Sequence, residues 1–152
     1  MACCGIIAFQ DFRERAVQWV WFPILGLVLS LIYIEHTSLE QYLVFATTNI
    51  LLVSLIIGFL FLYTKYIAKA RFLNVSFGLG DLLFFYAFAL GFPSMTFVLL
   101  FTAALFFSFL AFLASRTLDH RETVPLAGLM GLFLLGIHAV SFIPNVPYLY
   151  VL

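Results

Sequence analysis

Charged residues are scarce in this sequence. Seven Lys or Arg and seven Asp or Glu make up only 9% of the 152 residues, whereas soluble domains carry about 25%. Hydrophobic residues reach 65%, and the mean hydropathy is +1.17. This composition excludes an ordinary soluble domain and predicts an integral membrane protein in contact with lipid. The net charge of zero gives no indication of a nucleic-acid partner, and we expect none.

Metal-binding patterns and internal repeats are also lacking. Cys3 and Cys4 are the only cysteines, and two neighbours in sequence form neither a C-x-x-C zinc site nor a disulfide framework. The histidines at 36, 120 and 138 have no spacing that joins them into a metal site. We therefore expect no metal and no cofactor. Because no repeat, low-complexity segment or linker divides the chain, residues 1–152 are predicted to form a single domain.

Long apolar runs dominate what is present. A helix needs roughly 20 apolar residues to cross the hydrocarbon core of a bilayer, and five stretches are candidates: 16–34, 42–63, 75–92, 95–114 and 124–143. They lack the alternation of barrel strands, so the sequence predicts an all-α transmembrane bundle of five full spans. The first ten residues, MACCGIIAFQ, reach only about 15 Å as a helix and predict a short N-terminal helix before these spans.

The basic residues occupy alternate connections between the spans. They form three clusters: Arg13 with Arg15, then Lys65, Lys69 and Arg71, and finally Arg116 with Arg121. The other connections contain Glu35, His36 and Glu40, or almost no charge. Cytoplasmic loops of membrane proteins are enriched in Lys and Arg, so all three clusters are predicted to lie on the cytoplasmic side.

One acidic residue interrupts the apolar run FGLGDLLFFYAF at 77–88. Asp81 follows Gly78 and Gly80, and an acid inside a membrane segment is by default a functional candidate. The predicted topology puts it near the cytoplasmic end of its helix, and Asp11 near the cytoplasmic end of the opening helix. The two acids are therefore expected at one membrane face and at a similar depth.

Two aspartates in contact in a low-dielectric site share a proton, so that one can act as general base on water and the other as general acid. That chemistry hydrolyses peptides without a metal or a covalent nucleophile. Glycines beside the acid would let a substrate strand or a neighbouring helix approach the backbone closely. A structural alternative stays open, in which a lone acid near a helix end pairs with a nearby Lys or Arg.

The combination Gly78-Leu79-Gly80-Asp81 with Asp11-Phe12-Arg13-Glu14-Arg15 resembles the GxGD aspartic membrane peptidases, specifically the type IV prepilin peptidases. The resemblance covers about residues 5–130. It implies that Asp11 and Asp81 are the catalytic pair, with substrate contacts at Gly78 and Gly80. It also implies a bacterial inner membrane location, an active site toward the cytoplasm, and prepilin or pseudopilin precursors as substrates.

Two further features refine this expectation. The stretch Pro125-Leu126-Ala127-Gly128 resembles the proline-leucine segment that presenilins carry beside their acids, which makes Pro125 a candidate for substrate gating or simply the first residue of a helix. Bifunctional prepilin peptidases carry paired C-x-x-C motifs for zinc, and two adjacent cysteines do not supply them. We therefore expect an endopeptidase that cleaves without methylating. The alternative is a non-catalytic scaffold or small transporter subunit whose acids pair with Arg13, Arg15 or Lys69.

Overall fold

A computed structural model describes residues 2–14, 17–68, 78–116 and 126–141, and every regular element within these ranges is a helix. This confirms the predicted all-α class. The elements in chain order are α1 (Ala2–Glu14), α2 (Trp21–Glu35), α3 (Leu39–Tyr63), the π-helical turn η1 (Thr64–Ala68), α4 (Leu79–Ala89), α5 (Ser94–Arg116) and α6 (Leu126–Ser141).

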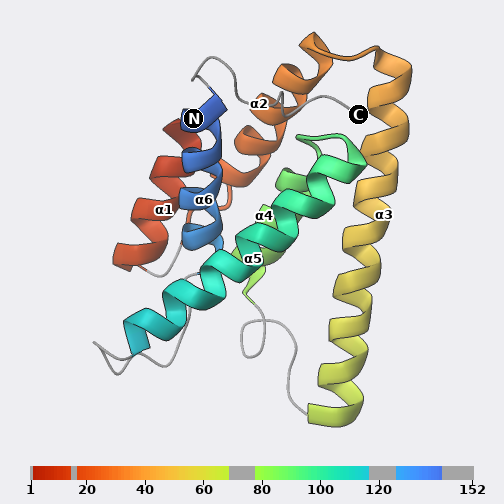
Figure 1. The fold of residues 1–152 in the computed structure, drawn as a ribbon. Helices are drawn as coiled ribbons and strands as arrows, with labels where there is room; N and C mark the ends of the chain where they lie inside the picture. The colour runs from red at the N-terminus through yellow and green to blue at the C-terminus, as the bar shows by residue number, and fades with distance from the viewer. Residues whose placement is uncertain (1, 15–16, 69–77, 117–125, 142–152) are drawn as a thin grey trace.

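Successive helices run in alternating directions (Figure 1). Helices α1, α3 and α5 end at the side where α2, α4 and α6 begin, which is the lower side of Figure 1. We call this side the aspartate end, because Asp11 is near the end of α1 and Asp81 is in the first turn of α4. Arg13 and Lys65 also lie on elements that finish at this end, as the charge pattern predicted.

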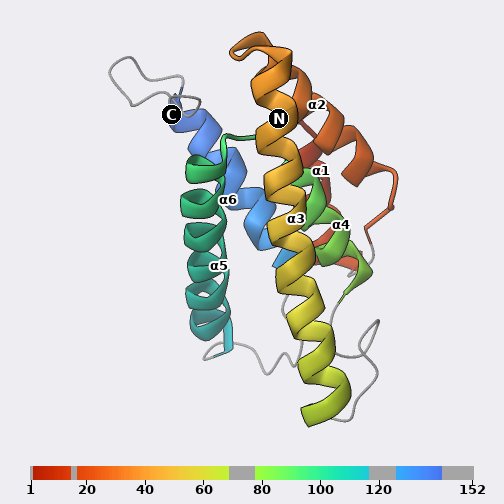
Figure 2. The same cartoon turned by 90° about the vertical axis from the view of Figure 1, so that its right-hand side faces the viewer.

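Among the residues that the structure describes, two helices are long and apolar enough to cross a membrane. They are the helix that continues from Leu39 to Tyr66, with 28 residues, and the segment Ser94–Ala114 of α5, with 21. Only 17% and 22% of their most apolar windows are buried, and the two helices lie on the outside of the bundle, α3 at the right edge of Figure 1 and α5 at the left edge of Figure 2. The other three apolar helices, α2, α4 and α6, have 15, 11 and 16 residues. The helix lengths therefore support two candidate spans and do not confirm the five full spans predicted from the sequence.

Proline and glycine account for the shorter helices. Pro23 has no N–H and fits only within the first turn of a helix, so α2 begins at Trp21 and not at the predicted residue 16. Gly78 has an extended backbone, with φ −71° and ψ 138°, and α4 therefore begins at Leu79. Pro93 precedes α5, and its carbonyl accepts the first helical hydrogen bond, from Phe97 N–H at 2.7 Å.

Phenylalanine rings fill the core between α4 and α5. Phe88 is fully buried, and its ring packs against four others at centroid distances of 5.6 to 6.1 Å, those of Phe84, Phe92, Phe97 and Phe101. These contacts are mostly edge-to-face, the geometry that aromatic pairs prefer. Helix α2 joins the same core closely, because the position of a Cβ on Gly26 would lie only 3.4 Å from Ala87 Cα.

One amide side chain connects α3 to the end of α4. Asn49 is fully buried, and its Nδ2 donates to the carbonyl oxygens of Ala89 at 3.0 Å and Phe92 at 2.9 Å. Ala89 is the last residue of α4, where carbonyls have no partner within the helix, and Phe92 lies in the turn that follows, so Asn49 provides a donor to carbonyls of both the helix end and the turn. Asn49 is a polar residue inside the apolar run 42–63, but it is not among the site residues predicted from the sequence.

Candidate active site

Both candidate catalytic acids meet the first turn of α6. The backbone N–H of Ala127 donates to Asp81 Oδ1 at 2.9 Å, and the next N–H along the chain, that of Gly128, donates to Asp11 Oδ2 at 2.6 Å. The two donors belong to adjacent residues, so backbone dimensions keep the two accepting oxygens within about 10 Å of each other. The carboxyl groups also interact electrostatically across this gap.

The start of α6 is suited to bind two carboxyl groups. The first N–H groups of a helix have no partner within it, and the aligned peptide dipoles give this end a partial positive charge. Ala127 and Gly128 are the second and third residues of α6, so their N–H groups are among these unpaired donors. The acids therefore complete the hydrogen bonding of α6, while α6 holds the acids side by side.

Asp81 also interacts with the start of its own helix. Gly78 is the residue before α4, its carbonyl accepts from Leu82 N–H at 3.2 Å, and its amide is a hydrogen-bond partner of the Asp81 carboxyl group. An acid at the third helical position that binds the N-cap amide is half of a capping box. Asp81 thus joins the first turns of α4 and α6.

Glycine lets each acid approach the neighbouring backbone. A Cβ on Gly78 would lie 2.9 Å from Asp81 Oδ2, and a Cβ on Gly128 would lie 3.0 Å from both Cβ and Oδ2 of Asp11. Real Cβ atoms are almost never found as close as 2.9 Å to another heavy atom, so an alanine at 78 would displace the Asp81 oxygen, and an alanine at 128 would push Asp11 away by a few tenths of an ångström.

Helix α1 contacts the same face of α6 farther along. A Cβ on Gly131 would lie 3.3 Å from the backbone oxygen of Cys4, and one on Gly5 would lie 3.7 Å from Leu135 Cδ1. Gly128 and Gly131 are three residues apart and so share one face of α6. Small residues on one face allow two helix backbones to pack closely, and here that packing brings Asp11 to the start of α6.

The other predicted site residues lie as follows. Gly80 faces α2, where its Cβ position would be 3.4 Å from Phe22 Cζ, so the described contact of Gly80 is with a neighbouring helix. A role of Gly78 or Gly80 in substrate binding stays a prediction. Pro125, Arg15 and Lys69 lie outside the described residues. The guanidinium of Arg13 is 5.7 Å from the centre of the Phe9 ring.

The aspartates are only partly buried, whereas the residues that flank them in the core are not exposed at all. Asp11 and Asp81 are half-buried, but Phe84, one turn after Asp81, and Ile7, one turn before Asp11, are completely buried. Water can therefore reach the carboxyl groups from the aspartate end and not from the centre of the bundle. Within the described ranges, no group of three or more His, Cys, Asp or Glu residues could hold a metal ion.

The chain was compared with protein-family models, with curated proteins and with solved structures, and none of them matches. The contacts of the aspartates are thus the observations on which a functional proposal rests.

Proposed function

We propose that this protein is an aspartic-type endopeptidase of the membrane, with Asp11 and Asp81 as its catalytic pair. The proposal is supported above all by one observation: Asp11 and Asp81, from different helices, bind the adjacent amides of Gly128 and Ala127. The length and apolarity of Leu39–Tyr66 and Ser94–Ala114 support placement across a membrane. The other three predicted spans would be α2, α4 and α6, each together with the residues that flank it in the predicted ranges 16–34, 75–92 and 124–143.

In the proposed mechanism the two carboxyl groups share one proton. The ionised carboxylate takes a proton from a water molecule as that water attacks the scissile carbonyl carbon, and the protonated carboxyl supports the developing oxyanion. The carboxyl group that took the proton from water then passes it to the leaving nitrogen as the C–N bond breaks. Each carboxyl oxygen has two lone pairs, so an oxygen that accepts an amide N–H can still contact water.

The proposed substrates are type IV prepilin or pseudopilin-like precursors. In these proteins a short basic leader precedes an apolar helix, and the leader remains in the cytoplasm. The basic residues Arg13 and Lys65 on the elements that finish at the aspartate end favour a cytoplasmic location of that end. The bacterial inner membrane is what the resemblance to the prepilin peptidases implies. A water-accessible pair of acids there suits cleavage between leader and helix.

The same hydrogen bonds also favour a second candidate function. Carboxyl groups that cap the first turn of α6 stabilise a helix end without any chemistry, as in a membrane scaffold or transporter subunit. In this alternative the acids pair with Arg13, Arg15 or Lys69, of which Arg15 and Lys69 lie outside the described residues; the contacts described for the acids are those with the helix amides.

Substitution by asparagine separates the two functions. Asn keeps an oxygen that accepts the amide N–H, but it cannot carry or shuttle the proton. We expect Asp11→Asn and Asp81→Asn to insert and unfold like the parent while losing cleavage of a reporter with a pilin leader and its apolar helix. Glu40→Gln, an exposed acid at the opposite end, is the matched control and should cleave normally. Normal cleavage by both Asp variants would exclude the peptidase.

A further inference from the structure

Among the described helices, α3 projects farthest at the aspartate end. In Figures 1 and 2 the C-terminal end of this helix extends beyond all the other helices at the aspartate end. Five consecutive residues, Phe59 to Tyr63, are each at least 39% exposed. Five residues at 100° each go once around a helix, so this segment is partly exposed on every face, although Thr64, which follows it, is buried.

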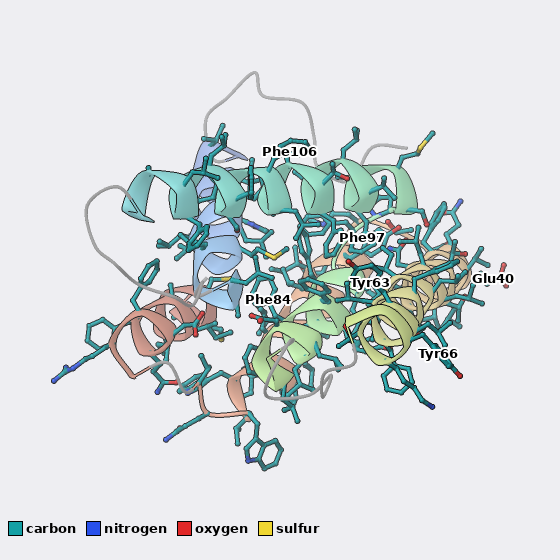
Figure 3. The ribbon with its side chains drawn as sticks, turned by 90° about the horizontal axis from the view of Figure 1, so that it is seen from below. Glu40, Tyr63, Tyr66, Phe84, Phe97 and Phe106 are labelled. Atoms are coloured by element: carbon teal, nitrogen blue, oxygen red, sulfur yellow. The ribbon has the colours of Figure 1, made fainter. Side chains whose placement is uncertain are left out.

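A lysine lies between two aromatic rings at the end of this projecting segment. Lys65 Nζ lies 5.9 Å from the centre of the Phe61 ring and 5.5 Å from that of Tyr66, which is cation–π distance in both cases. Tyr66 is 67% exposed, and in Figure 3, viewed toward the aspartate end, it points away from the other helices. We define Phe61, Tyr63, Lys65 and Tyr66 as the α3 tip.

The length of α3 assigns the tip to a particular layer of a bilayer. The 28 residues from Leu39 to Tyr66 extend about 42 Å as a helix. A bilayer has a hydrocarbon core of about 30 Å and measures about 40–45 Å with its headgroup layers. A helix of this length therefore reaches the headgroups at both ends, with Glu40 in one layer and the α3 tip in the other.

We propose that the α3 tip is a binding site for the headgroup of an anionic phospholipid. Tyrosine rings are enriched at this depth because they have an apolar body and a polar hydroxyl. The ammonium group of Lys65 contacts rings on its apolar side and can donate to a lipid phosphate on the other. The opposite end of the same helix carries Glu40, so the preference for anionic lipid is confined to the aspartate end.

This site would fix the depth of the catalytic pair. Ser54 Oγ and Tyr86 OH are 2.9 Å apart on antiparallel helices, so Asp81, five residues before Tyr86, is level with about Phe59 of α3. Lys65 is six residues farther along α3, or about 9 Å. With Lys65 held at the phosphates, the carboxyl groups lie just inside the hydrocarbon boundary, where an apolar substrate helix begins. The inference rests on the membrane placement proposed above, though not on peptidase activity.

Quenching of tryptophan fluorescence by brominated lipids tests the site. The native Trp19 and Trp21 are replaced by Phe, and Tyr66→Trp then supplies a single reporter at the tip. The protein is reconstituted in phosphatidylcholine vesicles that contain phosphatidylglycerol, with either one of the two lipids brominated. We expect the reporter to be quenched as if phosphatidylglycerol were enriched about fivefold around it, an enrichment that falls as salt is added.

Matched variants decide the outcome. Lys65→Gln should remove the enrichment and Lys65→Arg should keep it, while a reporter at the Glu40 end, Leu39→Trp, should have none. Equal quenching by the two lipids at Tyr66→Trp, or enrichment that persists in Lys65→Gln, would overturn the site.

A reporter on the outer face of α5, Phe106→Trp, tests the membrane placement itself, because Phe106 is 65% exposed outside the bundle (Figure 3). If neither brominated lipid quenches it, the membrane placement fails as well.

Discussion

Asp11 and Asp81 are hydrogen-bonded to two consecutive amides at the start of α6, although Gly128 is 117 residues from Asp11 and Ala127 is 46 residues from Asp81. Three helices far apart in sequence thus meet at one point. The helix α6 supplies unpaired donors, and α1 and α4 supply the acceptors. A change of less than 1 Å at this point should affect both carboxyl groups.

Gly128→Ala tests how closely Asp11 must approach α6. The new Cβ would lie 3.0 Å from Asp11 Cβ and Oδ2, and rotation of the carboxyl group cannot relieve the contact with Asp11 Cβ, so α1 must shift away by a few tenths of an ångström. Misplacing a catalytic group by about 1 Å can lower activity about 100-fold, so for this smaller shift we expect leader cleavage to fall about 10-fold. Gly136→Ala is the control on the same helix: its Cβ meets nothing within 4 Å, and alanine should stabilise the helix by up to about 1 kcal/mol. Equal activity of the two variants would contradict the prediction.

Gly78→Ala tests the contact on the other acid. The backbone of Gly78 is in an extended conformation that alanine adopts readily, so the effect should come from the Cβ, which would lie 2.9 Å from Asp81 Oδ2. Because this oxygen is at the end of a side chain, it can rotate away, and the protein should remain folded. We expect leader cleavage to fall about 10-fold or more, with a loss of at most about 1 kcal/mol in stability at the N-cap. Gly58→Ala, whose Cβ also meets nothing within 4 Å, should leave leader cleavage nearly unchanged and, like Gly136→Ala, stabilise its helix by up to about 1 kcal/mol.

The class of fold and the end of the bundle where the acids lie were accessible from the sequence. Apolar runs specify helices in lipid, and basic residues in alternate connections put Asp11 and Asp81 on helix ends that share one side. Helix lengths were less accessible, because one residue such as Pro23 shifts a boundary that hydropathy averages over. The runs therefore indicate where helices lie better than how far they extend.

The partners of the acids were not accessible from the sequence. Backbone N–H groups are present at every residue except proline, so the residue types of Ala127 and Gly128 do not identify them as donors to two distant carboxyl groups. Only the packing of α1 against α6 through Gly128 and Gly131 selects them. Asn49 is different: a single amide in an apolar run was a visible signal, and the criterion applied to Asp81 would have found it.

Asn49→Ala should destabilise the junction of α3 and α4. It would leave the carbonyls of Ala89 and Phe92 buried without their donor, and hydrogen bonds between membrane helices contribute about 0.6 to 1.7 kcal/mol. With the lost packing of a fully buried side chain, we expect a loss of about 2 kcal/mol, seen as a lower unfolding temperature in detergent by circular dichroism. Thr47→Ala is the control, because the Thr47 hydroxyl bonds only carbonyls of its own helix. A similar shift in both variants would mean that the interhelical bonds contribute little.

Phe88→Ala tests whether the aromatic core or the outer apolar surface holds the bundle together. Phe88 is fully buried among four phenylalanine rings, whereas Phe106 on α5 is equally apolar but 65% exposed. Deleting a buried phenylalanine ring leaves a cavity and typically costs about 3–5 kcal/mol. Deleting an exposed ring should change stability by less than about 1 kcal/mol, because lipid or detergent replaces its contacts. We therefore expect Phe88→Ala to unfold at a much lower temperature than Phe106→Ala. Equal losses would mean that the rings of α4 and α5 do not form the packed core, and the position of Asp81 at the start of α4 would then lack its support.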